Sequence, residues 1–264
     1  MIDLHSHILY GIDDGARDLQ MTLDMLKMAE EDGITTMVAT PHYIVGANQY
    51  DQEDLINRYH EVVAYMKKTA IAIDLLLGHE LYIDQYLPES LEKDQCYGIG
   101  DTSYLLVELP MMGIPTYTDQ VLYDLINRGY RPILAHPERY APVQEDPNIL
   151  MDYIKMGCLT QINSGSIKGL NGRKVAETAK LLLKNNMGHL VASDCHSNKR
   201  RNPRLSTAYN QVLAWIGKEK TDSLFFDNPQ KVLEDDDIDR EEPVPIQKRR
   251  DFLYVLRKYL VMTK

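Results

Sequence analysis

Residues 1–16 read Met-Ile-Asp-Leu-His-Ser-His-Ile-Leu-Tyr-Gly-Ile-Asp-Asp-Gly-Ala, and the rest of the chain is organised around this stretch. Apolar Ile2 and Leu4 alternate with polar residues, which is the period of a β-strand. Side chains along a strand point to opposite faces in turn, so His5 and His7 share one face, about 7 Å apart along the backbone. Two imidazoles placed in this way can chelate one metal ion. A solvated strand that contains two histidines by chance is the alternative.

Composition limits the class of protein. The chain has 264 residues, of which 44% are hydrophobic, enough for one large α/β domain or two small ones. We expect no membrane span, because no apolar run approaches the roughly 20 residues that a spanning helix needs. We expect no signal peptide, because a charged stretch begins at Asp3, where the apolar region of such a peptide would start. Three scattered cysteines argue against a disulfide framework, so we expect a cytoplasmic protein with free thiols. The net charge of −10 argues against a nucleic-acid partner.

Strand and helix patterns alternate over the first 220 residues. The predicted strands lie at 2–7, 36–40, 71–77, 104–110, 132–139, 159–165 and 189–196. The predicted helices lie at 19–32, 51–69, 121–128, 174–186 and 203–216. This alternation predicts parallel strands joined by right-handed crossovers. The apolar strand centres indicate a sheet that is covered on both faces.

The polar ends of these strands favour a barrel over an open sheet. Six of the seven predicted strands end in His, Asp or Glu at their C-terminal side. A barrel brings all of its strand ends to one mouth, whereas an open sheet spreads them along an edge. We therefore predict an α/β fold with a distorted seven-stranded (β/α) barrel, formed as one domain by residues 1–233.

The end of the chain, residues 234–264, has a different composition. Residues 234–242 are acidic, Pro243 and Pro245 predict an extended linker, and residues 248–250 are basic. Helical spacing follows at Phe252, Leu256, Tyr259 and Leu260. We therefore predict a basic amphipathic C-terminal helix. Packing on the barrel and binding to a surface are both consistent with this pattern.

Nine side chains at or near the predicted strand ends are potential metal ligands: His5, His7, Asp14, His42, Glu80, Glu108, His136, Asp194 and His196. Five imidazoles and four carboxylates suit two or three divalent ions of the Mn, Fe or Zn kind. The absence of thiolates argues against a structural zinc site. Three dications would leave a charge of about +2 on this set, which would attract an anion and lower the pKa of bound water.

Arg139 and Arg201 follow two of these potential ligands closely in the sequence. A guanidinium in such a place can bind a phosphate group through two parallel hydrogen bonds. A surface salt bridge is the alternative for Arg139. Arg200 and Arg204 compete for the role given to Arg201.

Cys195 and Arg201 also match Cys-x5-Arg, the signature of cysteine-dependent phosphatases. That chemistry needs a thiolate at the base of a loop whose backbone amides surround the phosphate. The five intervening residues include no glycine, and Cys195 should point away from Asp194 and His196 along the strand. We therefore reject a cysteine nucleophile.

A resemblance to a known superfamily rests on Asp14, Glu108 and five short motifs: His5-Ser-His7, Thr40-Pro-His42, Gly78-His-Glu80, His136-Pro-Glu-Arg139 and Ser193-Asp-Cys-His196. These residues resemble the polymerase-and-histidinol-phosphatase (PHP) superfamily. The segments 12–15, 135–139 and 161–166 are similar to a narrower group, the bacterial manganese-dependent protein-tyrosine phosphatases encoded with capsule and exopolysaccharide synthesis genes. The resemblance extends over about residues 1–230.

The resemblance implies a site with three metal ions and two phosphate-binding arginines. The first ion would be held by His5, His7, Glu80 and Asp194. Glu80 would bridge to a second ion, held also by Glu108 and His136, and the third would be held by Asp14, His42 and His196. Arg139 and Arg201 would bind the phosphate.

The resemblance also implies the reaction and the partner. A metal-bridging hydroxide, with Mn²⁺ as the metal, would hydrolyse protein phosphotyrosine. The substrate protein would be a membrane-associated bacterial tyrosine kinase that regulates capsule or exopolysaccharide synthesis. Two alternatives remain, a small-molecule phosphatase of the histidinol-phosphate kind and a non-catalytic regulatory PHP module.

Overall fold

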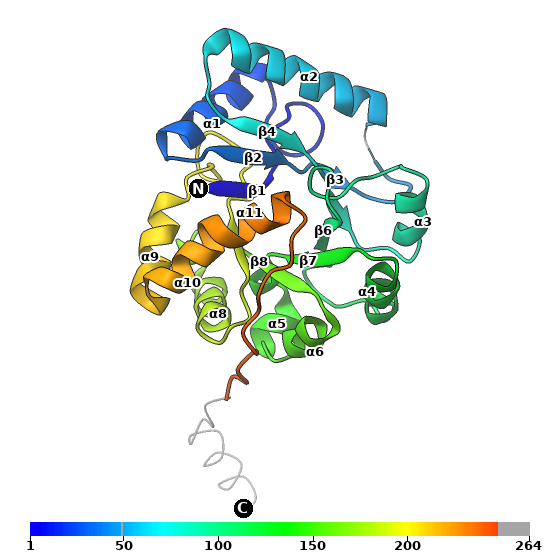
Figure 1. Cartoon of the computed structure of the whole chain (residues 1–264), viewed down its shortest axis with the longest axis vertical. Coiled ribbons are helices and arrows are strands. Elements are labelled where there is room, and N and C mark those ends of the chain that lie inside the picture. The colour runs from blue at the N-terminus through cyan, green and yellow to red at the C-terminus, as the bar shows by residue number, and fades with distance from the viewer. Residues whose placement is uncertain (49, 248–264) are drawn as a thin grey trace, which may run out of the picture.

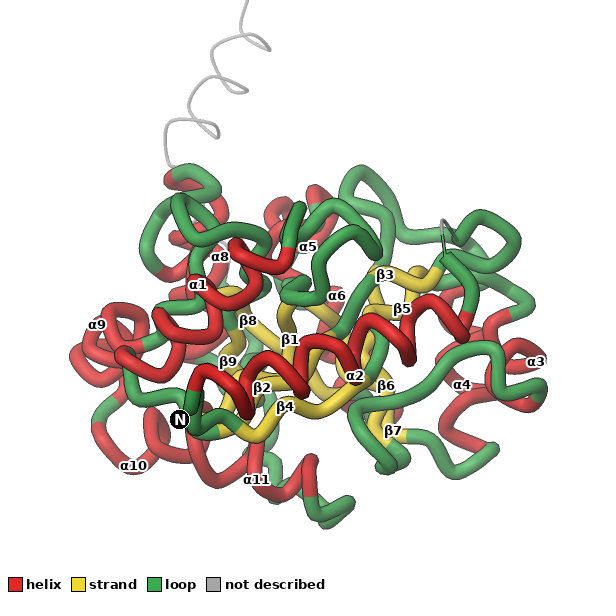
Figure 2. The backbone as a smooth tube through the Cα atoms, turned by 90° about the horizontal axis from the view of Figure 1, so that it is seen from above, coloured by secondary structure: helices red, strands yellow, loops and turns green. Residues whose placement is uncertain are grey.

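The structure is a computed structural model that describes residues 1–48 and 50–247. The amphipathic helix predicted near the C-terminus lies outside the described residues. The strands form a three-stranded sheet in the order β1-β2-β4 and a six-stranded sheet in the order β3-β5-β6-β7-β8-β9. Helices surround both sheets (Figures 1 and 2). None of the described helices is long and apolar enough to cross a membrane.

The strands are short, and neighbours within each sheet pair in parallel. They are β1 (Ile2–Ser6), β2 (Thr36–Ala39), β3 (His42–Tyr43), β4 (Asp74–Leu77), β5 (Glu80–Tyr82), β6 (Tyr104–Glu108), β7 (Arg131–Ala135), β8 (Leu159–Asn163) and β9 (Leu190–Ala192). Every residue of β1, β6 and β8 is buried, which agrees with the prediction of a covered sheet. The predicted α/β class with parallel strands is confirmed.

The longer helices lie where apolar periodicity predicted them. They are α1 (Leu19–Glu31), α2 (Gln52–Thr69), α4 (Thr118–Asn127), α8 (Arg173–Lys184) and α9 (Ser206–Ile216). Asp18 caps α1, because its carboxylate accepts a hydrogen bond from the amide of Met21 at 2.8 Å.

Further helices are too short to show a period in the sequence. They are α3 (Leu87–Glu92), α5 (Ala141–Glu145), α6 (Ile149–Met156), α7 (Ser164–Ile167), α10 (Lys218–Asp222) and α11 (Asn228–Leu233), with a 3₁₀ turn at Pro137–Arg139 and a π-helical turn at Ser223–Asp227. These one- and two-turn elements pack through the apolar residues that they bury, such as Val143 in α5 and Leu150 in α6.

The predicted seven-stranded barrel is not confirmed, because the described residues form no closed barrel. Two short strands that were not predicted, β3 and β5, follow the predicted strands 36–40 and 71–77. They lie in the six-stranded sheet, whereas β2 and β4 lie in the three-stranded sheet. Pro41 has no N–H to donate to a ladder and separates β2 from β3. Gly78 separates β4 from β5, where a Cβ would lie 2.7 Å from the carbonyl oxygen of Gly98. A single bridge between Ser6 and Cys195 joins β1 to the chain after β9.

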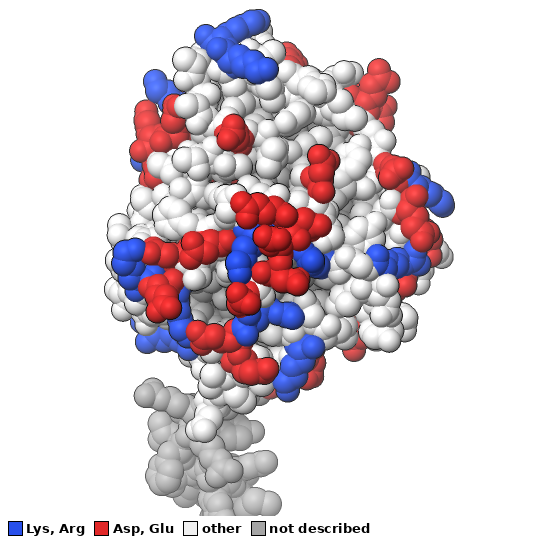
Figure 3. Space-filling model, in the orientation of Figure 1, with Lys and Arg blue, Asp and Glu red and all other residues white. Residues whose placement is uncertain are grey.

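The N-terminal ends of β6 and β7 are covered by the chain that follows α11. The carboxylate of Asp235 accepts hydrogen bonds from the amide and hydroxyl of Ser103, and Arg131 donates to the carbonyl of Asp235. Further along, the amide of Ile246 donates to Asn148 at 2.8 Å. Acidic side chains gather on this face near the end of α11 (Figure 3). The opposite, C-terminal ends of the strands hold the predicted ligands.

Candidate metal centre

Glu80, the first residue of β5, lies at the centre of four imidazoles. Its Oε2 atom lies 3.2 Å from Nε2 of His5, 3.2 Å from Nε2 of His7 and 3.1 Å from Nδ1 of His42. Its Oε1 atom lies 2.9 Å from Nε2 of His136. The Glu80 side chain is almost fully buried, so this carboxylate is enclosed by imidazole nitrogens from three different parts of the chain.

Glu108 and Asp194 approach the same imidazoles from two sides. Glu108 ends β6, and its Oε1 atom lies 3.6 Å from Nε2 of His136. Asp194 follows β9, and its Oδ1 atom lies 3.6 Å from Nε2 of His5 and 3.5 Å from Nε2 of His7. Carboxylate oxygens and imidazole nitrogens at such separations can share one metal ion between them.

The cluster has a closed side and an open side. His5, His7 and Glu80 are buried, whereas the side chain of Asp14 is 65% exposed and that of His42 is 27% exposed. On the open side, the Oδ1 atom of Asp14 lies 3.5 Å from Nε2 of His42 and 3.3 Å from Nε2 of His196. A molecule from solvent therefore reaches the cluster at Asp14 and His42.

The structure thus brings the nine predicted ligands to one place. Seven of them fall into three groups, in each of which all ligand atoms lie within 4.8 Å of one another: His5, His7 and Glu80; His42, Glu80 and Glu108; and His7, Asp14, His42 and His196. The other two, His136 and Asp194, lie beside Glu80 and beside His5 and His7, respectively. The grouping differs from the predicted one at His7 and His42. His7 also lies in the group of Asp14, and His42 lies beside Glu80 and Glu108 as well as beside Asp14.

A carboxylate that sequence reasoning did not assign orients two of these histidines. Asp13 accepts a hydrogen bond from Nδ1 of His7 at 2.6 Å and another from the backbone amide of His42 at 3.1 Å. The amide of Gly15 donates to its second oxygen at 3.0 Å. With Nδ1 of His7 bonded to Asp13, its Nε2 lone pair points into the cluster, as in carboxylate–histidine–metal sites.

Two amide side chains of β8 connect the predicted ligands His5 and Asp194. Nδ1 of His5 lies 2.8 Å from the amide oxygen of Gln161, and the amide nitrogen of Gln161 donates to Asn163 at 2.8 Å. Asn163 in turn donates to Asp194 at 2.5 Å. With Nδ1 of His5 as the donor, this chain leaves Nε2 free to bind a metal ion.

Arg139 and Arg201 both reach the cluster through Asp194. Arg139 donates to Oδ2 of Asp194 at 3.1 Å, and Arg201 donates to Oδ1 at 2.7 Å. Arg200 and Arg204 contact other groups instead, so Arg201 is the arginine of this segment that lies at the site. Both arginines are partly exposed, so a bound anion can reach them from solvent.

The charges in the cluster balance only when imidazoles are protonated. Burial alone would lower the pKa of His7, but Asp13 and Glu80 raise it to about 10. Burial and the neighbouring Glu80 raise the pKa of Glu108 to about 7. These groups therefore hold protons that divalent cations would displace, because metal ligands must be deprotonated. The donor set and its burial fit a site for such cations.

Cys195 is part of the hydrophobic core. The residue is fully buried, and burial raises the pKa of its thiol further above the ordinary range. The backbone carbonyl of Cys195 accepts a hydrogen bond from the amide of His7 at 2.9 Å, which fixes it beside β1. A buried, protonated thiol cannot attack a phosphate, which agrees with the rejection of a cysteine nucleophile.

A family model described as "Capsular polysaccharide synthesis, CpsB/CapC" matches residues 1–234. The chain belongs to the CpsB/CapC family. Its relatives include the tyrosine-protein phosphatase YwqE of Bacillus subtilis, 33% identical over 252 residues that cover 96% of this chain and 99% of that protein. The tyrosine-protein phosphatase CpsB of Streptococcus pneumoniae is 30% identical over 240 residues, 89% of this chain and 99% of that protein. The family predicted from the motifs is confirmed.

Solved structures give the same result. One from a study titled "Crystal structures of YwqE from Bacillus subtilis and CpsB from Streptococcus pneumoniae, unique metal-dependent tyrosine phosphatases" superposes with a TM-score of 0.90, at 33% identity, and covers 94% of this chain and 100% of that chain. A phosphotriesterase homology protein of Escherichia coli, with phosphate in its active site, matches with a TM-score of 0.51 at 13% identity, over 86% of this chain and 97% of that chain. That second likeness shows a related fold.

Proposed function

We propose that this protein is a metal-dependent tyrosine phosphatase of the CpsB/CapC type. The observation that supports this most directly is the arrangement of four imidazoles around the buried carboxylate of Glu80, with Arg139 beside them. The relatives named tyrosine-protein phosphatases match nearly the whole chain. The reaction is the hydrolysis of phosphotyrosine to tyrosine and phosphate.

The metal ions are held by the nine clustered side chains, in the assignment that the family resemblance implies. We infer two or three ions, with Mn²⁺ as the first choice and Fe or Zn as alternatives, because the donors are nitrogen and oxygen atoms only. When bound, such ions supply Lewis acidity to the phosphate and lower the pKa of water to near neutrality.

The side chains around the ions have separate tasks. Arg139 and Arg201 exchange Asp194 for the phosphate oxygens and stabilise the charge that develops on them. Asp13 and Gln161 hold His7 and His5 in the tautomer that leaves Nε2 free. The buried side of the cluster excludes water from behind the ligands. The leaving tyrosyl oxygen departs as a phenolate and needs no assigned acid.

A protein substrate fits the open side of the cluster. The exposed Asp14 and half-open His42 admit a side chain that projects from a chain segment, and an enclosed small-molecule pocket would bury them. We propose that the substrate is a phosphotyrosine of a membrane-associated tyrosine kinase in capsule or exopolysaccharide synthesis, which the family description supports. The reaction would take place in the cytoplasm.

We also propose that residues 1–233 form the catalytic domain and that a separate acidic, proline-containing segment begins at residue 234. The described part of this segment packs on the domain through Asp235 and Ile246. The family match, which ends at residue 234, supports this division.

Hydrolysis assays test the proposal. The purified protein should hydrolyse p-nitrophenyl phosphate and a phosphotyrosine peptide with Mn²⁺, and lose both activities in EDTA. Histidinol phosphate, assayed at the same Mn²⁺ concentration, should have a much lower kcat/KM. A preference for histidinol phosphate would replace this proposal with the small-molecule alternative, and no hydrolysis at all would favour a regulatory module.

The Cys195→Ser variant tests the nucleophile. Because the thiol is buried and protonated, we expect the variant to keep most of the wild-type kcat, and thiol alkylation of the wild type to have little effect. Inactivation of the variant together with wild-type activity that is indifferent to EDTA would instead indicate a cysteine mechanism.

A further inference from the structure

The segment directly after the ligand His196 is the most basic part of the site's surroundings. Residues 197–204 read Ser-Asn-Lys-Arg-Arg-Asn-Pro-Arg, with four cations and no carboxylate, in a chain of net charge −10. We call these residues the basic loop. A local excess of one charge in a protein of the opposite net charge attracts ligands that the rest of the surface repels.

The basic loop is held in a defined shape. The backbone amides of His196 and Ser197 both donate to the carbonyl of Arg201, at 2.9 and 3.0 Å. The side chain of Asn202 donates to the carbonyl of Lys199 at 2.7 Å. Lys199 and Arg200 are exposed at the tip of the loop. The loop therefore presents two cations at a fixed place next to the cluster.

Two of the four cations already have carboxylate partners. Arg201 pairs with Asp194, and Arg204 lies 3.8 Å from Glu31. Lys199 and Arg200 form no ion pair with any carboxylate in residues 1–48 and 50–247, and Arg200 instead donates to a backbone carbonyl at 2.6 Å. Their positive charges are thus available to a ligand.

A third cation lies on the neighbouring element. Lys168, directly after α7, donates to the carbonyl of Arg204 at 2.8 Å. A small cleft of about 20 Å³ is lined by Lys168, Asn163, Asp194, Arg200, Arg201 and Asn202. Lys168 and Arg200 therefore adjoin both a proposed metal ligand, Asp194, and a proposed phosphate-binding arginine, Arg201.

We propose that the basic loop and Lys168 form a second anion-binding surface, which binds carboxylate or phosphate groups near the target phosphotyrosine of the substrate. This inference rests on the proposed function. The surface makes the enzyme select peptides with anionic side chains beside the phosphotyrosine. Because the contacts are exposed, each ion pair changes kcat/KM by about two- to fivefold and is weakened by salt.

Three phosphotyrosine peptides of equal length test the selection. In the first peptide, aspartates flank the target phosphotyrosine. In the second peptide, asparagines flank it, and in the third the flanking residues include one further phosphotyrosine. For the wild type at low salt, we expect kcat/KM to be at least about threefold higher for the first and third peptides than for the second. The ratio should approach one in about 0.5 M salt.

Charge reversal locates the effect. Burial lowers the pKa of Lys168, so the test uses the exposed pair, as Lys199→Glu with Arg200→Glu. This double variant should lose the preference for aspartate over asparagine or invert it. Lys184→Glu is the matched control: Lys184 is an exposed lysine at the end of α8, which leads to the N-terminal end of β9, away from the cluster. It should keep the wild-type ratio.

The outcomes separate this inference from the proposed function. If the wild type hydrolyses all three peptides equally, or if the double variant keeps the aspartate preference, the inference is wrong while the phosphatase assignment stands. If the wild type hydrolyses none of them with Mn²⁺, the proposed function itself fails. If the second phosphotyrosine raises kcat/KM and aspartate does not, the surface recognises phosphate groups. If both raise kcat/KM, the surface recognises negative charge in general.

Discussion

The two ends of the strands balance their charges in different ways. At the N-terminal ends, cations pair with acids on the surface: Arg131 lies 3.4 Å from Asp235 and 3.3 Å from Asp237, and Lys231 lies 2.9 Å from Asp239. At the C-terminal ends, the imidazoles and Glu80, Glu108 and Asp194 are buried together. At the N-terminal ends, lysine and arginine side chains supply the positive charges that pair with carboxylates. At the C-terminal ends, the carboxylates are balanced only when the imidazoles are protonated or metal ions are bound.

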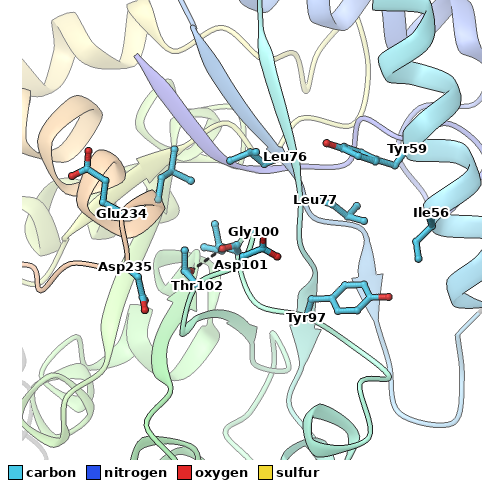
Figure 4. A pocket seen from close by; sticks show the side chains of 12 residues that line it. Ile56, Tyr59, Leu76, Leu77, Tyr97, Gly100, Asp101, Thr102, Glu234 and Asp235 are labelled. Carbon is cyan, nitrogen blue, oxygen red and sulfur yellow. Dashed lines mark hydrogen bonds between the residues drawn. The ribbon is translucent and has the colours of Figure 1, made fainter.

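This difference in charge balance identifies the site better than cavity volume does. A cavity of about 670 Å³ lies beside β4 and the start of β6, lined by residues such as Ile56, Tyr59, Leu76, Asp101 and Glu234 (Figure 4). Its lining contains apolar and acidic side chains but no imidazole and no cation. Within residues 1–48 and 50–247, the groups of side chains that could hold a metal ion lie instead at the strand ends with the crowded imidazoles, next to Arg139 and Arg201.

Glu80→Ala should have the largest effect at the C-terminal ends. Glu80 contacts four imidazoles, so its loss should remove more than one ion and lower kcat by more than about a hundredfold, beyond the range typical of an outer-shell partner. Metal analysis with activity assays measures this, and Asp14→Ala, at the exposed edge, should cost less. Full metal content with normal turnover would contradict the assignment.

Gln161→Met tests the buried support behind His5. Methionine has a similar length but cannot accept from Nδ1 of His5 or donate to Asn163. Loss of such an outer partner weakens metal binding by about tenfold to a hundredfold. We expect a higher Mn²⁺ concentration for half-maximal activity and recovery of kcat at saturating Mn²⁺. An unchanged Mn²⁺ dependence would show that the chain from His5 to Asp194 does not hold the ligands.

Arg139→Ala should reduce substrate use without loss of metal. A charge-assisted hydrogen bond to phosphate is worth about 1.5–3 kcal/mol, or roughly tenfold to a hundredfold. Because Arg139 also contacts Asp194, metal content is measured on the same sample, and Arg139→Lys is the charge-conserving control. We expect kcat/KM for phosphotyrosine peptides to fall at least about tenfold. If kcat/KM and metal content fell together, the role of Arg139 would instead be to hold Asp194 in place.

Much of this site could be predicted because strand geometry is local. The alternation around His5 and His7 placed both on one face, and the polar strand ends predicted a shared site. The strands β3 and β5, after Pro41 and Gly78, were missed, because two or three residues are too few to show a period. The barrel was predicted because a closed sheet brings polar strand ends to one mouth, but two separate sheets bring them together here.

The outer partners could not be predicted from one sequence. Gln161 lies 156 residues from His5, and no spacing rule connects them. The Asp13-Asp14 pair was a visible signal, but only the fold shows that Asp14 faces the open side while Asp13 bonds to His7. Pairing in space decides which of two adjacent carboxylates binds metal and which one orients a ligand.

Asp235→Ala should have the smallest effect on catalysis. The carboxylate of Asp235 accepts from the amide and hydroxyl of Ser103 at 2.9 and 2.7 Å, far from the cluster. We expect kcat/KM within about twofold of wild type and a free energy of unfolding lower by about 1 kcal/mol, since the site is partly exposed. Urea unfolding with Mn²⁺ present measures this, and Asp237→Ala, at a 90% exposed side chain, should change stability less.

The stability difference at Asp235 should also depend on pH. Hydrogen bonds from Ser103 lower the pKa of Asp235 in the folded state. The stabilisation is therefore present above the unfolded pKa, about 3.9, and is lost as the pH falls through the lower folded value. Unfolding curves of wild type and Asp235→Ala should converge in acid. If Asp235→Ala lost most of its activity at neutral pH, the N-terminal and C-terminal ends of the strands would be coupled. The assignment of a structural role to the first and a functional role to the second would then be wrong.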